Sequence, residues 1–143
     1  MEIPILFLSE IIELYKPSYH KFLNESRKGN MIGFIKFFLQ CIIEQCSNYI
    51  AKINRIKQIY IKDMKKLENL KSNAVYRIMP AIMRQIVFTK KEIEEESGVS
   101  RNTVLTLIDK LVKLNILVPD SNYAKLSYRY NEIYNVFVGR DIS

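Results

Sequence analysis

A long amphipathic stretch between Met31 and Lys71 dominates the pattern of apolar and polar positions along the chain. Apolar or small residues recur there at steps alternating between three and four, which is the spacing of a helix with one apolar seam. Gly33 is the only strong helix breaker in the stretch, so we expect one helix of roughly 60 Å. We expect the preceding helices to cover the first half of the seam, while the second half bridges to another part of the chain or pairs with a second chain. The seam consists of Leu39, Ile42, Cys46, Tyr49, Ile53, Ile56, Tyr60, Met64 and Leu67.

Two shorter helices are predicted ahead of this stretch. Residues 3–15 carry apolar side chains at helical spacing, and Pro17 then restarts the chain, with Ser18 as the predicted cap of a second helix. That helix is expected to run to about residue 28 because Gly29 is a typical helix stop. Asn30 offers the next cap.

A further helical stretch covers residues 72–88. Pro80 either begins a helix within it or kinks a longer helix. We place a domain boundary near residue 71, which separates a helical region at 1–71 from a second domain at 72–143.

The segment from Phe88 onward has the signals of two short helices joined by a tight turn. Thr89 and Glu92 form a capping box, and Gly98 stands where such a turn needs a residue that tolerates a positive φ. Ser100 is expected to cap the second helix. One apolar stripe of that helix is formed by Val104, Leu107, Ile108 and Leu111.

Two strands are predicted after this pair of helices. Residues 116–118 form the first strand, residues 120–122 the turn, residues 125–130 the second strand, and residues 131–138 a closing helix. The pattern is that of a winged helix-turn-helix. The expected fold class is therefore mainly α: a helical bundle with one long connecting helix, followed by a winged helix-turn-helix with a two-stranded β wing.

In such a fold the start of the second helix enters the DNA major groove. Arg101 is then placed to read guanine and Asn102 adenine, while serine and threonine hydroxyls contact phosphates or bases. The alternative is that these are ordinary capping and surface residues on a fold used for protein contacts. The candidate DNA-binding residues are Ser100, Arg101, Asn102, Thr103, Thr106 and Lys110 on the helix, and Asn122, Lys125 and Arg129 in the wing.

The excess positive charge behind the net charge of +7 lies outside the helix-turn-helix and the wing. Basic and acidic residues balance over residues 89–114 and again over residues 115–143, so the excess lies between residues 52 and 84. DNA affinity depends mainly on neutralising phosphates. A helix-turn-helix and wing without net charge therefore favour DNA binding less than the total charge of the chain suggests. One helical stripe of cations can supply phosphate contacts or be a solvated face: Lys52, Arg55, Lys62 and Lys66.

Few residues are suited to metal, redox or catalytic chemistry. Cys41 and Cys46 are expected to be buried structural thiols, and His20 to lie on a helix surface or edge. We expect no metal site, no cofactor and no membrane span, because ligand spacing and long apolar runs are missing from the sequence. The acidic residues near the N-terminus do not fit a secretion signal, so we expect a cytoplasmic protein.

Three segments resemble a known family. Pro4–Ser9 is similar to a Pro-x-Leu-Tyr-Leu-Ser segment, and Tyr19–Leu23 resembles a paired-tyrosine helix with His20 in place of the second tyrosine. Gly29–Leu39 resembles a Gly-Asp-Trp-x-x-Trp-Ile-x-Phe-Phe-Leu segment, with Met31 and Phe34 at the tryptophan positions. With the long helix and the helix-turn-helix in the same order, the chain resembles the C-terminal half of Fic-family proteins, which transfer AMP from ATP to protein hydroxyls.

The resemblance implies a polypeptide without the transferase machinery. The family motif His-Pro-Phe-x-Asp/Glu-Gly-Asn-Gly-Arg-x-x-Arg supplies a general base and a phosphate-binding loop, and the sequence contains no such string. We therefore expect a non-catalytic tail that regulates through DNA or a partner, with a second copy or a Fic-motif-bearing chain as partner. The alternative is a purely structural tail of a split or truncated AMP transferase that does not bind DNA.

Overall fold

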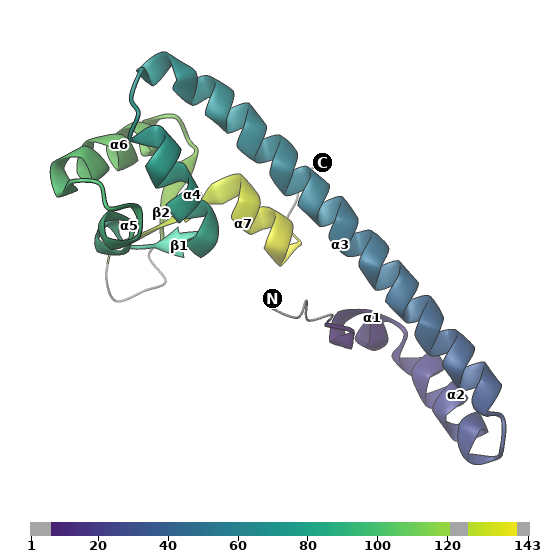
Figure 1. Cartoon of the computed structure of the whole chain (residues 1–143). Coiled ribbons are helices and arrows are strands. Elements are labelled where there is room, and N and C mark those ends of the chain that lie inside the picture. Colours follow the sequence, from purple (N-terminus) through teal and green to yellow (C-terminus); the bar gives the residue numbers. More distant parts are fainter. Residues whose placement is uncertain (1–6, 121–125, 140–143) are drawn as a thin grey trace. The chain divides into compact units, whose positions relative to one another are not determined.

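The computed structural model describes residues 7–120 and 126–139, and these residues are mainly helical (Figure 1). The chain divides into two compact units, one ending at Ile53 and the other beginning at Asn54, within a single long helix. The domain boundary predicted near residue 71 stays a prediction. The helices are α1 (Ser9–Leu14), α2 (Lys16–Arg27), α3 (Met31–Leu67), a 3-10 turn (Glu68–Leu70), α4 (Val75–Gln85), α5 (Lys90–Ser97), α6 (Arg101–Lys113) and α7 (Asn131–Val138). The strands are β1 (Val87–Phe88), β2 (Leu117–Asp120) and β3 (Ser127–Tyr130).

The long helix is confirmed. Asn30 caps α3 as predicted, because its side-chain oxygen accepts a hydrogen bond from the Gly33 N–H at 3.3 Å. Gly29, with φ +101°, separates α2 from that cap. At the other end the helix tightens into the 3-10 turn, and Lys71 adopts a left-handed conformation with φ 45°. A single Gly33 does not break a helix of this length because its neighbours supply both hydrogen bonds and packing.

In the first unit, α1 and α2 pack along the N-terminal half of α3. The ring of Phe22 stacks on that of Phe37 at 5.2 Å, and Tyr19 meets Phe34 at 6.0 Å. Ile11 and Cys41 are buried between these helices. Aromatic side chains of α3 therefore decide which of its faces the shorter helices cover.

The predicted seam of α3 is wrong in its first half. Leu39, Cys46 and Ile53 are exposed, and the prediction that both cysteines are buried fails with Cys46. The shorter helices cover the aromatic face of α3 instead, and helical spacing alone does not show which of two apolar faces is covered. In the second unit Ile59 and Leu67 are buried, so the second half of α3 lies against that unit's core.

The first two helices also begin differently from the prediction. Ser18 lies inside α2 rather than at its cap, and Tyr15 is the capping residue, although its side chain makes no capping hydrogen bond. Pro17 fits in the first turn because the N–H it lacks would have no partner within the helix there. Of residues 3–15, only those from Phe7 are described, and the helix among them begins at Ser9.

Pro80 lies inside α4, which agrees with the longer-helix alternative and not with a helix that begins at Pro80. The hydrogen bond that Pro80 cannot make would go to the carbonyl of Tyr76, which is an exposed residue. The buried face of the helix, which enters the core of the second unit, consists of Val75, Ile78, Met79, Ala81 and Ile82.

A small antiparallel sheet completes the second unit. The strand order is β1-β3-β2, with Phe88 opposite Tyr128 and Leu117 opposite Tyr130. β1 was not predicted because it has only two residues between a helix end and a helix cap. The predicted apolar stripe of α6 is confirmed, and all four of its members lie in the core with the sheet and α4: Val104, Leu107, Ile108 and Leu111.

The two strands after α6 differ in detail from the prediction. Asp120 is not in the turn; it ends β2, is buried, and its carbonyl accepts a hydrogen bond from the Ser127 hydroxyl at 3.0 Å. β3 begins at Ser127 rather than at residue 125. Asn122 and Lys125 lie outside the described residues.

The start of α5 and the turn between α5 and α6 follow the predicted pattern. Thr89 and Glu92 form a reciprocal capping box, and Gly98 ends α5 with φ +61°. Ser100 precedes α6, but its hydroxyl lies 2.9 Å from the Thr103 hydroxyl and makes no capping bond to the backbone. Ser100 therefore occupies the predicted N-cap position, but its side chain does not make the capping hydrogen bond.

Replacing Gly98 with alanine is expected to lower the free energy of unfolding by about 1–2 kcal/mol, because a Cβ is strained at this positive φ. A Cβ there would also lie 3.0 Å from a guanidinium nitrogen of Arg77. Gly98→Asn should lose less, since asparagine tolerates the left-handed conformation. Urea unfolding measures both, and equal losses for the two variants would contradict the role of backbone strain.

Candidate nucleic-acid interface

The outer face of α6 carries a row of polar side chains opposite its buried stripe. Asn102, Thr106 and Lys110 follow one another at helical steps of four and are exposed, and Thr103 beside them is half-buried. The Thr106 hydroxyl donates to the carbonyl of Asn102 at 2.9 Å, which fixes the direction of its own oxygen lone pairs. These side chains present both donors and acceptors away from the core, as the sequence predicted.

A shallow hollow of about 250 Å³ runs beside this row. It brings together four of the six predicted helix residues, namely Asn102, Thr103, Thr106 and Lys110, with Leu107 at its base. Ser72, which lies in the segment before α4, also lines the hollow. Sequence reasoning missed Ser72 because only the tertiary fold places it beside α6. We call Asn102, Thr103, Thr106, Lys110 and Ser72 the α6 polar face.

Arg101 lies apart from the α6 polar face. It lines a second hollow, which it shares with Lys90, Lys91, Glu94 and Glu95 of α5. Carboxylates near a guanidinium compete with DNA phosphates and with a guanine edge for the same donors. The structure therefore does not bring Arg101 into the group formed by Asn102, Thr106 and Lys110.

The charges around α6 are mixed. Lys113, in the last turn, is exposed and adds a cation that was not among the predicted site residues. The carboxylate of Asp109, which is also exposed, forms an ion pair with the Lys90 ammonium of α5 at 3.1 Å. Besides Arg101 at its start, α6 therefore carries its exterior cations in its C-terminal half, at Lys110 and Lys113.

Arg129, predicted as a wing contact, is built into the packing of the sheet. Its guanidinium carbon lies 4.9 Å from the ring centre of Tyr134 in α7, and a terminal nitrogen lies 3.9 Å from Asp120. Its Nε is buried, with no hydrogen-bond partner among the described residues. These contacts fix the guanidinium between β3 and α7.

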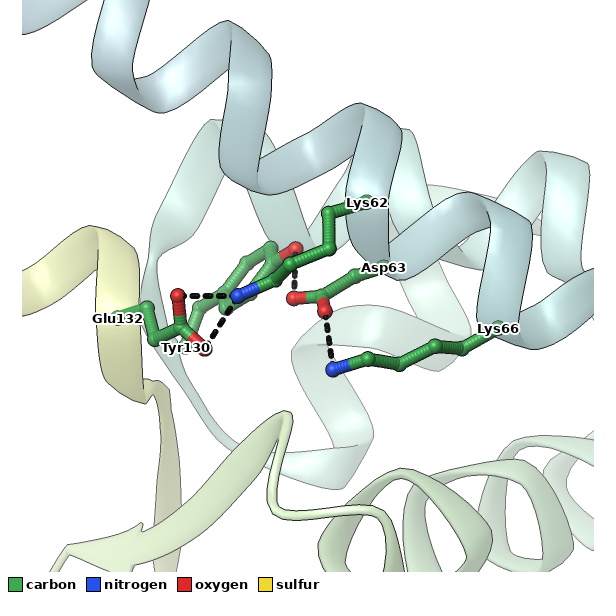
Figure 2. Close-up of polar contacts among 5 residues, drawn as sticks. All are labelled: Lys62, Asp63, Lys66, Tyr130 and Glu132. Carbon is green, nitrogen blue, oxygen red and sulfur yellow. Dashed lines mark hydrogen bonds and ion pairs between the residues drawn. The ribbon is translucent and has the colours of Figure 1, made fainter.

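Carboxylates hold three cations that were predicted to contact phosphates, namely Lys52, Lys62 and Lys66. In the second unit, Lys62 lies 2.7 and 2.6 Å from the two oxygens of Glu132, and Lys66 lies 2.9 Å from Asp63 (Figure 2). In the first unit, Lys52 pairs with Glu10 at 3.5 Å. Arg55 is exposed on the same helix. A phosphate would have to compete with Glu132, Asp63 and Glu10 for these ammonium groups.

Figure 2 also shows a buried polar contact between α3 and β3. The Tyr130 hydroxyl donates to Asp63 at 2.9 Å, and both side chains are almost completely buried. Burial raises the pKa of Tyr130, and the negative charge and hydrogen bond of Asp63 raise it further. Asp63 therefore links α3 to β3, and its second oxygen pairs with Lys66 one turn further along the same helix.

Within the described ranges, no three His, Cys, Asp or Glu side chains gather so as to hold a metal ion. None of the helices in these ranges combines the length and the apolar character that crossing a membrane requires. No protein-family model matches the chain, and a search of curated proteins finds no significant similarity.

Proposed function

We propose that residues 72–143 form a winged helix-turn-helix that binds duplex DNA, with α6 as its recognition helix. The order α4, β1, α5, α6, β2, β3 and the central position of β3 in the sheet support this assignment. The observation that carries the proposal is the α6 polar face, which sets an amide, hydroxyls and an ammonium side by side around one hollow.

The chemistry of this face suits base edges and phosphates. An asparagine amide can make two hydrogen bonds to the major-groove edge of adenine, which gives Asn102 the sequence-reading role. Lys110, two turns further along the helix, is positioned for a phosphate or a guanine edge. Thr106 and Ser72 add hydroxyls of the kind that bind phosphate oxygens and fix the register of a protein on the duplex.

The proposal predicts a modest dependence of affinity on salt. Only a few cations, among them Lys110 and Lys113, lie on the exterior of α6, while Lys62 and Lys66 are held by carboxylates. Two to four phosphate contacts correspond to a slope of about −2 to −4 for log K against log salt concentration.

The test is binding of fluorescently labelled duplex DNA, measured by anisotropy from low to physiological ionic strength. Binding with that salt slope supports the proposal. Undetectable binding at low ionic strength, or binding that does not change with salt, contradicts it, because phosphate contacts release counterions.

A second candidate function is that of a protein-interaction tail without DNA binding. Its support is the balanced charge of residues 89–143 together with the carboxylate partners of Lys52, Lys62 and Lys66. Under this proposal the chain is the non-catalytic tail of a Fic-like AMP transferase and binds a chain that carries the Fic motif. Co-purification with such a polypeptide from the native host supports it, and recovery without one contradicts it. AMP transfer by the purified chain alone would contradict both candidates.

A further inference from the structure

One face of α3 in the first unit is apolar and uncovered. Seven residues line it over a length of about 30 Å, and the six aliphatic side chains among them are 49 to 68% exposed. Soluble monomers rarely expose so long a continuous apolar surface. We call this surface the open stripe: Ile32, Ile35, Leu39, Ile43, Cys46, Ile50 and Ile53.

The open stripe is separate from the face that α1 and α2 cover. Phe34, Phe38 and Cys41 point toward the covered face, about a third of a turn around the helix from the stripe. The charges Glu44 and Lys52 of α3 contact Tyr15 and Glu10, which belong to the α1–α2 side, and exposed Lys36 borders the stripe. The stripe itself therefore contains no charged residue and has no partner from the described part of the first unit.

The open stripe has nearly the same spacing of apolar residues when it is followed from either end of the helix. Ile32 and Ile53 are equally far from a midpoint between residues 42 and 43, as are Ile35 and Ile50, and Leu39 and Cys46. Two such helices running in opposite directions therefore place apolar side chains opposite one another along the whole stripe. This is the condition for an isologous interface with two-fold symmetry, in which each subunit uses the same surface.

The area of the open stripe fits a stable dimer. A half- to two-thirds-exposed aliphatic side chain presents about 100 Å². The six aliphatic side chains of the stripe therefore present about 600 Å², compared with the roughly 800 Å² that each partner buries in a standard interface.

Charge favours the antiparallel direction. The C-terminal half of α3 carries a run of cations, and a parallel pair would set the two runs side by side. An antiparallel pair centred between residues 42 and 43 places these runs at opposite ends. The cations are Arg55, Lys57, Lys62, Lys65 and Lys66.

We propose that the open stripe is the interface for a second copy of this chain, with the two α3 helices antiparallel and Leu39 of each copy opposite the partner's Cys46. The dimer rests on the first unit and does not depend on DNA binding. The self-complementary spacing indicates a second copy of this chain as the partner, and not a chain that carries the Fic motif.

The first test is the mass of the purified full chain under reducing conditions, by light scattering and sedimentation over a range of concentrations. The wild type should be a dimer, and Ile43→Glu should weaken dimerisation at least 100-fold because it introduces a charge near the centre of the stripe. Phe137→Glu is the matched control, since Phe137 is 55% exposed in α7 and lies outside the stripe. Far-ultraviolet circular dichroism checks that each variant keeps its helix content.

The second test fixes the direction of the helices by disulfide formation. Leu39→Cys should crosslink to the partner's Cys46 on mild oxidation, and Leu39→Cys with Cys46→Ser should not. In the wild type, the two Cys46 residues of an antiparallel pair are about 10 Å apart along the axis, which is too far for a disulfide. Cys41 should stay reduced, because it is buried and that burial raises the pKa of its thiol.

Three results would overturn the proposal. They are a wild type that is monomeric or joins only another protein, a dimer that Ile43→Glu leaves intact, and a wild type that crosslinks through Cys46. The last result would indicate parallel helices.

Discussion

Replacing Asp63 with alanine is expected to lower the free energy of unfolding by about 3 kcal/mol, measured by chemical denaturation. The carboxylate is 1% exposed, accepts a hydrogen bond from the Tyr130 hydroxyl at 2.9 Å and pairs with Lys66 at 2.9 Å. Its removal leaves the Tyr130 hydroxyl buried without its acceptor, and a buried polar group that loses its partner is costly. Tyr130→Phe should cost less, about 1.5–2 kcal/mol, because Lys66 still pairs with Asp63.

The matched control is Glu132→Ala. It removes the ion pair with Lys62, in which the two side chains are 47 and 42% exposed. Ion pairs that accessible to solvent contribute at most about 1 kcal/mol, so this variant should unfold nearly like the wild type. If Asp63→Ala and Glu132→Ala lower the free energy of unfolding by similar amounts, the buried contact stabilises the fold no more than the exposed ion pair does.

The same tyrosine predicts a loss of stability in alkali. Burial and the neighbouring Asp63 raise the pKa of Tyr130 above its unfolded value of 10.0, so at high pH the unfolded chain loses this proton first. The stability that the neutral tyrosine contributes is therefore present below about pH 10 and is lost as the pH rises above that value. The wild type should lose more stability than Tyr130→Phe between about pH 9 and 11. If the wild type and Tyr130→Phe lose the same amount of stability over this pH range, the raised pKa of Tyr130 is contradicted.

Combined substitution of Asn102 and Lys110 by alanine is expected to weaken binding of a preferred duplex about 100-fold. Asn102→Ala should mainly reduce the difference in affinity between the preferred and a random duplex, since the amide reads a base edge. Lys110→Ala should weaken binding to both duplexes equally and make the salt slope about one unit shallower, since it removes a phosphate contact. Fluorescence anisotropy with both duplexes separates the two effects.

Lys91→Ala provides the control for this pair. Lys91 is exposed on α5, pairs with Glu95 at 3.5 Å and lies outside the α6 polar face. Its removal changes the net charge of the chain by the same amount as Lys110→Ala, yet it should change affinity by less than about two-fold. Equal effects of Lys91→Ala and Lys110→Ala would mean that total charge, rather than the α6 polar face, determines the affinity.

Local rules made the segment around the α5–α6 turn predictable. The Thr89–Glu92 capping box and the positive φ of Gly98 depend on residues within a few positions of one another, and each was found where the sequence placed it. The buried stripe of α6 was predictable because helical spacing fixes which positions share a face. Ser100 is at the predicted N-cap position, but its hydroxyl contacts Thr103 instead of the backbone.

Contacts between distant residues were not predictable. Asp63 and Tyr130 are 67 positions apart, and nothing in the local pattern of either marks a hydrogen bond between them. The carboxylate partner of Lys62, and the place of Ser72 beside α6, likewise depend on tertiary packing. Periodicity also cannot choose between two apolar faces of one helix, which is why the seam containing Leu39 was assigned to the wrong side of α3 in the first unit.

The central claim is that the α6 polar face contacts duplex DNA, and nuclear magnetic resonance of the labelled chain titrated with a duplex tests it most directly. The account predicts that amide shift changes gather at Ser72, Asn102, Thr106 and Lys110, and that they grow as the salt concentration falls. Shift changes confined to other surfaces, or no changes at low ionic strength, would contradict it.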